Sequence, residues 1–239
     1  RDGEYQIPEF AKSYQVIPFA LRGHGQSGKP RGSYDIPTFA ADAAGLLKSL
    51  GTGPAHVVGL SLGGAVALQL AIDTPHVVRS LTIANSTPEF VVRTLKDRLM
   101  LWQRQLIPKW FGMRTLGRLL ANRLFVKPEH EQLRQTFVRR WVENDKRAYL
   151  NTLKSMIGWS VVSELPSIHM PALFVSAEHD YFPSTKTERH IARMPDARLL
   201  VVPDTRHALP AENPDAFNPV VLDFLAHIAV RSDTRIQSS

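Results

Sequence analysis

The chain has 239 residues, of which 44% are hydrophobic and 21% are charged, a balance typical of a soluble globular protein with a sizeable core. It contains no cysteine, which excludes disulfides, thiolate metal sites and cysteine nucleophiles. No apolar run approaches the roughly 18 residues that a membrane-spanning helix needs. The net charge of +7 arises in residues 88–159, where fifteen Lys and Arg stand against six Asp and Glu.

Outside residues 88–159, short β-branched runs alternate with helical patterns, which is typical of a mostly parallel sheet with helices on both faces. We therefore expect an α/β fold. The expected strands are residues 14–21, 55–60, 78–84, 172–176 and 197–202, the expected helices are residues 36–50, 62–72, 184–194 and 214–229, and residues 232–239 form a polar tail.

Residues 88–159, called the insertion below, carry long amphipathic helical patterns and no convincing strand. We interpret the insertion as a helical cap, which leaves residues 1–87 and 160–231 as the α/β core. Trp102, Met156 and Trp159 are candidates for a substrate pocket, although aromatic residues at helical spacing mostly pack helices together. The arginines of the insertion are expected to form a solvated outer face, the alternative being attraction of an anionic substrate or surface; they include Arg93, Arg104, Arg118, Arg139, Arg140 and Arg147.

The motif G-x-S-x-G occurs at Gly59, Ser61 and Gly63, between an apolar strand and a helix rich in alanine and leucine. A serine between such elements sits on a sharp turn that exposes its hydroxyl at the carboxyl edge of the sheet. The N–H of Leu62, at the start of the helix, would face an oxyanion. Ser61 is therefore the candidate nucleophile. The alternative is a glycine-rich turn whose serine is idle.

A serine hydroxyl needs a base to remove its proton and an acid to hold that base. Asp180 lies just after the strand of residues 172–176, and His207 lies in the loop after the last expected strand. Position singles out His207, because the other eight histidines lie in other loops, in strands or on helices. The competing carboxylates for the acid are Glu178, Asp204 and Glu89.

Four segments together resemble the α/β-hydrolase superfamily, in its branch of capped esterases and lactonases: RGHGQSGKP, GLSLGG, SAEHDYFP and PDTRHALP. The resemblance covers residues 14–229. It implies hydrolysis of an ester or similar acyl bond through an acyl-enzyme, with no cofactor and no metal. In the family an HG motif supplies the second oxyanion donor, and residues 1–11 resemble the segment that directly follows this motif. We therefore expect the functional protein to have about 30 or more further residues upstream, enough for two or three strands.

The leading hypothesis is a carboxylesterase acting on a small-molecule ester. A lactonase, thioesterase, carbon–carbon bond hydrolase or cofactor-free perhydrolase would use the same three residues. A non-catalytic binding protein of this fold would be expected to lack one of them. Nucleic acid is not an expected partner. Proteins that bind single strands combine basic residues with aromatic residues on which bases stack, whereas the basic residues here lie on predicted helices without that alternation. No leader sequence is visible after Arg1. We expect a cytoplasmic protein without a membrane span. The oligomeric state stays open, with a homodimer among the options.

Overall fold

The computed structural model describes residues 3–237 of the chain, with side chains as far as residue 230. Its centre is one parallel sheet whose strands lie in chain order. The strands are β1 (Ala55–Leu60), β2 (Val78–Ala84), β3 (Ala172–Ala177) and β4 (Ala197–Val202). Each parallel pair is joined by a crossover, and the large insertion lies within the crossover between β2 and β3.

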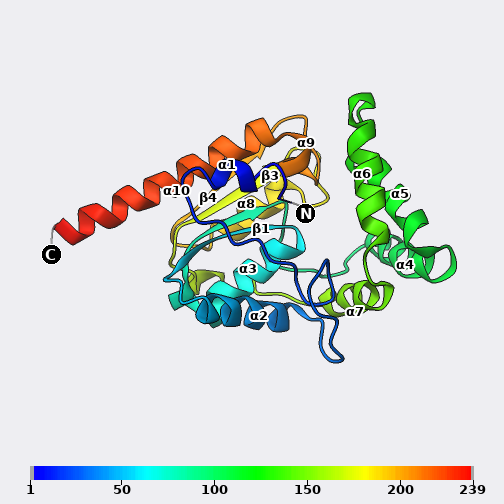
Figure 1. Ribbon diagram of the computed structural model, residues 1–239, viewed down its shortest axis with the longest axis horizontal. Helices are drawn as coiled ribbons and strands as arrows, with labels where there is room; N and C mark the ends of the chain where they lie inside the picture. Colours follow the sequence, from blue (N-terminus) through cyan, green and yellow to red (C-terminus); the bar gives the residue numbers. More distant parts are fainter. Residues whose placement is uncertain (1–2, 238–239) are drawn as a thin grey trace.

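Helices cover both faces of this sheet, and the helical insertion stands to one side of the layers (Figure 1). The helices of the core are α1 (Ile7–Phe10), α2 (Ile36–Ser49), α3 (Leu62–Asp73), α8 (Ser184–Ile191), α9 (Leu209–Glu212) and α10 (Pro214–Gln237). Short 3₁₀ turns are present at η1 (Pro75–Val77) and η3 (Leu165–Ser167) in the core and at η2 (Pro128–His130) in the insertion.

The sheet divides the core into two apolar layers because neighbouring strand residues point to opposite faces. Phe174 faces the cluster formed with α2, α3 and α8. Leu173 and Val175, on either side of it, face the cluster formed with α9 and α10. All three side chains are buried, so β3 is apolar on both faces, as expected for an inner parallel strand.

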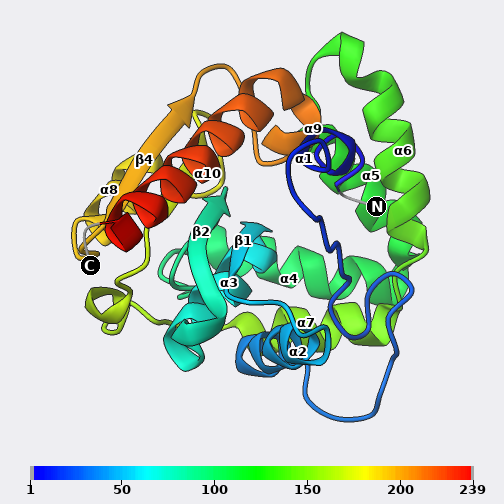
Figure 2. The same ribbon diagram turned by 60° about the vertical axis from the view of Figure 1, so that its left-hand side comes forward.

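The positions of the four core strands predicted from sequence are confirmed to within one residue. The prediction of a strand at residues 14–21 is wrong, since this segment joins no sheet and runs as a coil (Figure 2). A strand needs a neighbour for its backbone groups, and no described strand pairs with this one; Pro18 also lacks the N–H that a ladder requires. The last helix extends to Gln237 rather than ending at residue 229, so residues 232–237 of the expected polar tail continue it, and residues 238–239 lie outside the described residues.

The insertion folds into four helices, α4 (Leu95–Trp110), α5 (Gly112–Leu124), α6 (Glu131–Val142) and α7 (Lys146–Met156). A capping box starts α4: the Thr94 side chain accepts from the Asp97 N–H, and the Asp97 side chain accepts from the Thr94 N–H. The insertion has its own apolar cluster, built around Leu116, Leu120 and Tyr149.

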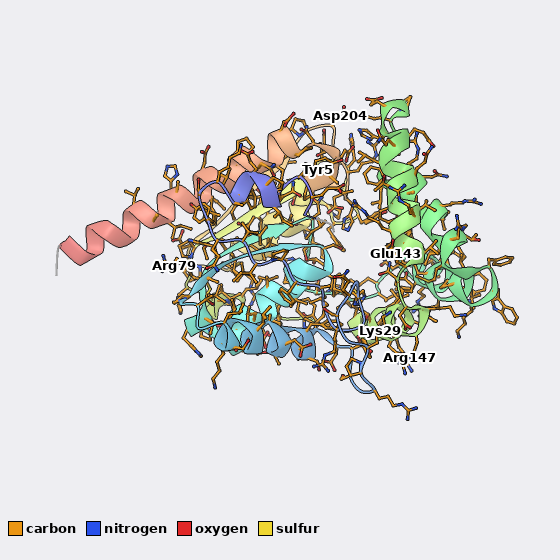
Figure 3. The ribbon with its side chains drawn as sticks, in the orientation of Figure 1. Tyr5, Lys29, Arg79, Glu143, Arg147 and Asp204 are labelled. Carbon is orange, nitrogen blue, oxygen red and sulfur yellow. The ribbon has the colours of Figure 1, made fainter. Side chains whose placement is uncertain are left out.

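Polar contacts fix the insertion against the core. The Arg147 guanidinium donates to the carbonyl of Lys29 at 3.4 Å, and these two residues lie near each other in Figure 3. On the opposite side of the molecule, Lys127 pairs with Asp204 at 2.6 Å. The two connecting segments also pair with each other, because the Phe90 N–H donates to the carbonyl of Trp159 at 2.8 Å. The insertion therefore has a defined position relative to the sheet.

Candidate active site

Ser61 occupies a strained turn between β1 and α3. Its φ of 52° and ψ of −114° lie outside the conformations that a residue with a side chain ordinarily adopts. Two glycines make the turn possible: a Cβ on Gly59 would come within 2.3 Å of the Gly63 carbonyl oxygen, and one on Gly64 within 2.6 Å of the Ser86 Cβ. Gly63, the last residue of the motif, has open space around its position. The steric requirement therefore falls on Gly59 and Gly64.

Ser61, His207 and Asp180 form one hydrogen-bonded row. His207 Nε2 lies 2.8 Å from Ser61 Oγ, and His207 Nδ1 lies 2.5 Å from Asp180 Oδ1. Because a carboxylate can only accept, Nδ1 carries the proton in this arrangement, and Nε2 accepts from the serine hydroxyl. The Asp180 side chain is 1% exposed and the His207 side chain 14%, so the row is shielded from water.

Sheet topology explains why three residues distant in sequence meet. Ser61 follows β1, Asp180 lies in the loop after β3, and His207 lies in the loop after β4. In the parallel register Ala84 lies opposite Leu60, and Ala177 lies opposite Val202, so the carboxyl ends of the strands are level. All three loops therefore leave the sheet at the same edge.

Asn85, which the sequence analysis did not single out, connects two of these loops. It follows β2, has a φ of 43°, and is 1% exposed. Its side-chain amide donates to the carbonyls of Arg206 at 3.1 Å and His207 at 2.9 Å, while its Oδ1 accepts from the Ala177 N–H at 2.7 Å. Asn85 thus fixes the backbone of His207 to the end of β3. The sequence did contain a sign of this role: Asn85 comes directly after a buried strand, and asparagine is one of the few residues that readily adopt the left-handed αL conformation.

Replacing Asn85 with alanine is expected to lower kcat by about 10- to 100-fold, because displacement of a catalytic group by about 1 Å has an effect of this size. Asn85→Asp keeps the acceptor for Ala177 and loses both donors toward the His207 loop, so its kcat should also fall. The measurement is 4-nitrophenyl acetate hydrolysis, with Asn151→Ala on the exposed surface of α7 as the control. Wild-type kcat in Asn85→Ala would show that the loop holds His207 without this amide.

The N–H of Leu62 is the expected oxyanion donor in this site. Leu62 is the first residue of α3, and the N–H groups of a helix's first turn have no acceptor within the helix. The positive end of the helix dipole lies at the same place. One donor for a developing negative charge is therefore available beside Ser61.

The rival carboxylates lie away from His207. Glu89, 6% exposed, is held by Arg93 and by Lys186, each at 2.9 Å, where the insertion meets α8. Burial alone would raise the pKa of Glu89, but the hydrogen bonds and charges of Lys186 and Arg93 outweigh it and lower that pKa. Asp204 pairs with Lys127 at the surface, and the Glu178 carboxylate accepts from the Asp204 N–H. Asp180 is thus the carboxylate beside the histidine.

The three candidates for the substrate pocket differ in how far they are buried. Trp102 is 60% exposed on α4, so the expectation that it lines a pocket is not supported. Met156 and Trp159 are partly buried against the larger core cluster. The Trp159 indole N–H donates to Gln69 Oε1 on α3 at 2.8 Å.

An aromatic row connects Trp159 to the site, and its inner members were missed from sequence. Trp159 packs against Phe90 with ring centroids 5.6 Å apart, Phe90 against Phe182 at 6.0 Å, and Phe182 against His207 at 6.0 Å. Tyr181 packs closer, with its ring centroid 4.7 Å from that of His207. Tyr181 and Phe182, which directly follow Asp180, thus pack against the histidine ring, and Phe90 of the connecting segment reaches it through Phe182.

The described residues show neither a metal-binding cluster nor a membrane-spanning helix. They hold no group of three or more His, Asp or Glu side chains placed to bind a metal ion. In the same part of the chain, no helix combines the length and the apolar character needed to cross a membrane.

A parallel sheet with a serine at a strand-to-helix turn, followed in the chain by an acid and a histidine, defines the α/β-hydrolase class of protein. The comparison with known proteins agrees. A family model described as the alpha/beta hydrolase family matches residues 4–220, and the chain belongs to this family.

Individual relatives have different activities in their names. A putative carbamate hydrolase, RutD, from Azorhizobium caulinodans is 29% identical over 246 residues, which cover 93% of this chain and 85% of the relative. The structure of an enol-lactonase from Burkholderia xenovorans LB400 has a TM-score of 0.85 and 25% identity, covering 94% of this chain and 86% of that one. A thermophilic esterase from Thermogutta terrifontis also has a TM-score of 0.85, at 21% identity, covering 95% and 85%, and shows likeness of fold.

Proposed function

We propose that the protein is a serine hydrolase that cleaves carboxylic esters through an acyl-enzyme, with Ser61 as nucleophile, His207 as general base and Asp180 as the acid that orients it. The observation that carries this proposal is the hydrogen-bonded row from Asp180 through His207 to a serine on a strained turn. Strain of this kind persists where the surrounding structure enforces it, and it is typical of active sites.

The proposed reaction has two halves. Ser61 Oγ attacks the ester carbonyl carbon while His207 Nε2 takes the serine proton, and the Leu62 N–H donates to the developing oxyanion. The tetrahedral intermediate then collapses, the carbon–oxygen bond to the alcohol breaks, and His207 gives its proton to the leaving alkoxide. In the second half His207 deprotonates a water molecule, which attacks the acyl carbon. The carbon–Oγ bond then breaks, His207 returns the proton to Ser61 Oγ, and the carboxylic acid leaves.

Cyclic esters fit the same chemistry, because a lactone carbonyl is attacked in the same way and its alcohol remains attached to the acyl group. The enol-lactonase relative supports this extension. The carbamate in the name of the RutD relative is also an acyl group bearing a leaving group, so the three residues could act on it without change.

We also propose that the insertion is the cap of this active site. The aromatic row from Trp159 to His207 supports the proposal, because it places a residue of the connecting segment in line with the base. Trp159 and Met156 remain candidates for the wall of the substrate pocket, whereas Trp102 is withdrawn because of its exposure.

The test is a panel of 4-nitrophenyl esters, lactones and acyl thioesters with purified protein, together with a serine-directed phosphonate. We expect turnover of at least one ester, inhibition by the phosphonate, and a phosphonyl adduct on Ser61 by mass spectrometry. An adduct on another serine, or activity that the phosphonate leaves intact, would contradict the assignment.

A further inference from the structure

Arg104 is an unpaired guanidinium on the inner face of α4. It lies three residues from both Leu101 and Ile107, which pack against the apolar cluster of the insertion, and residues at this spacing share one helix face. The Arg104 side chain is partly buried, and its Nε is fully buried without a hydrogen-bond partner. The expectation that Arg104 belongs to a solvated outer face is therefore wrong.

Several other arginines of the insertion have a carboxylate partner. Arg93 pairs with Glu89, Arg134 with Glu131, and Arg140 with Glu4. Among the described residues, no ion pair or hydrogen bond is made by Arg104. A charged group withdrawn from water is costly unless a partner of opposite charge approaches it. Arg104 thus has the properties of a group kept for an anionic ligand.

Tyr149 places a second unsatisfied polar group beside this arginine. Tyr149 lies on α7, is 9% exposed, and its hydroxyl is buried without a hydrogen-bond partner. Burial raises the pKa of Tyr149, and the nearby charge of Arg104 opposes this rise, which places the guanidinium within electrostatic reach of the phenol. A hydroxyl and a guanidinium that both lack acceptors can donate to the same carboxylate.

Arg104 also lies within electrostatic reach of the catalytic row. Burial raises the pKa of Tyr181, and Arg104 is the first of the charges that oppose this rise. Tyr181 follows Asp180 directly and packs on the His207 ring at 4.7 Å. The guanidinium is therefore close enough for its charge to act on a residue that packs against the catalytic histidine.

We propose that Arg104, with the Tyr149 hydroxyl, binds a carboxylate of the substrate, so that the preferred substrates are esters or lactones carrying a free carboxylate apart from the scissile bond. This inference rests on the ester hydrolysis proposed above and adds the substrate class. Arginine suits the role because its planar fork matches the two oxygens of a carboxylate. The basic balance of the insertion would draw such an anion toward the site.

The test compares two esters that differ only in charge, mono(4-nitrophenyl) adipate and 4-nitrophenyl methyl adipate. We expect the wild type to have the higher kcat/KM for the free acid. In Arg104→Gln the ratio of the two kcat/KM values should fall by about 10- to 100-fold, the size expected for losing hydrogen bonds to a charged group. Arg98→Gln, which removes the same charge from an exposed position on the same helix, should keep the wild-type ratio.

The outcomes separate this inference from the proposed function. Turnover of both esters with no preference for the acid, or an unchanged ratio in Arg104→Gln, would overturn the carboxylate site and leave ester hydrolysis in place. Turnover of neither ester would count against ester hydrolysis itself. Tyr149→Phe keeps the ring that packs in the cluster and removes the hydroxyl, so its ratio should fall as well; a wild-type ratio would overturn the role of Tyr149.

A binding measurement tests the site without turnover. In the Ser61→Ala background, adipate should raise the thermal unfolding midpoint, because a ligand that binds only the folded state stabilises it. The added Arg104→Gln change should remove most of this rise, and the added Arg98→Gln change should keep it. Equal rises in all three proteins would overturn the proposal, and the midpoints without adipate show whether each variant is folded.

Discussion

Ser61→Ala is expected to lower kcat for 4-nitrophenyl acetate on the order of 10⁶-fold, the effect of removing the nucleophile from a serine–histidine–acid row. The loss should be this large because, among the residues whose side chains are described, Ser61 Oγ is the hydroxyl that His207 Nε2 contacts, at 2.8 Å. The measurement is the steady-state release of 4-nitrophenol from 4-nitrophenyl acetate, with a preparation of the variant that contains no wild-type protein.

The fold should survive this change. Alanine occupies no more space than serine, and the backbone of the turn is held by other groups: the Ser61 N–H donates to the Ala84 carbonyl, and the Ser86 hydroxyl donates to the Ser61 carbonyl. Circular dichroism and the unfolding midpoint should therefore match the wild type, and Ser163→Ala on the surface serves as the activity control. Retention of wild-type turnover in Ser61→Ala would remove Ser61 from the reaction.

The sequence was informative where local pattern and fold agree. Apolar runs of five to seven residues predicted β1 to β4. The inner strands β2 and β3 are buried along almost all of their length, and strands buried on both faces need continuous apolar sequence. The positions of Ser61, Asp180 and His207 at the ends of these strands followed, since parallel strands present their carboxyl ends at one edge. The whole row could thus be named before its distances were known.

Pairing partners could not be predicted in the same way. Residues 14–21 have the composition of a strand, yet a strand is defined by its neighbours, and composition does not show whether one is present. Asn85 is a related case: its three hydrogen bonds join residues about 90 to 120 positions away in the chain, and they exist only after β2, β3 and the His207 loop are assembled.

Whether a charged side chain faces water or lies against the interior was the property that the sequence predicted least well. The arginines of the insertion occur on amphipathic helices, and a basic residue on such a helix usually faces water. Arg104 departs from this rule because its position on α4 coincides with the face that Leu101 and Ile107 turn toward the insertion's own cluster. The total charge of the segment indicated an anionic partner as one alternative, but only the packing of α4 identified the residue that could bind one.

Asp180→Asn is expected to reduce kcat by about 10⁴-fold with little change in structure, as an acid-to-amide change does in serine proteases. Asp180 Oδ1 lies 2.5 Å from His207 Nδ1, and it also accepts the Tyr181 N–H at 2.7 Å. An asparagine whose oxygen keeps this position can accept from both groups, but it lacks the negative charge that stabilises the imidazolium. An asparagine that turns its amide N–H toward the ring instead favours the histidine tautomer with its proton on Nε2. That tautomer cannot accept the serine proton, so the base is lost although every ring remains in place.

Asp204→Asn provides the matched control for this change. Asp204 lies three residues before His207, its side chain is 72% exposed, and asparagine tolerates its φ of 48°. The control loses only a surface ion pair with Lys127, which contributes little to stability. We expect its kcat to stay near the wild-type value on 4-nitrophenyl acetate. If the two variants lost activity equally, or if Asp204→Asn lost more, the acid of the row would have to be reassigned, because the buried carboxylate beside His207 would then have no special part in turnover.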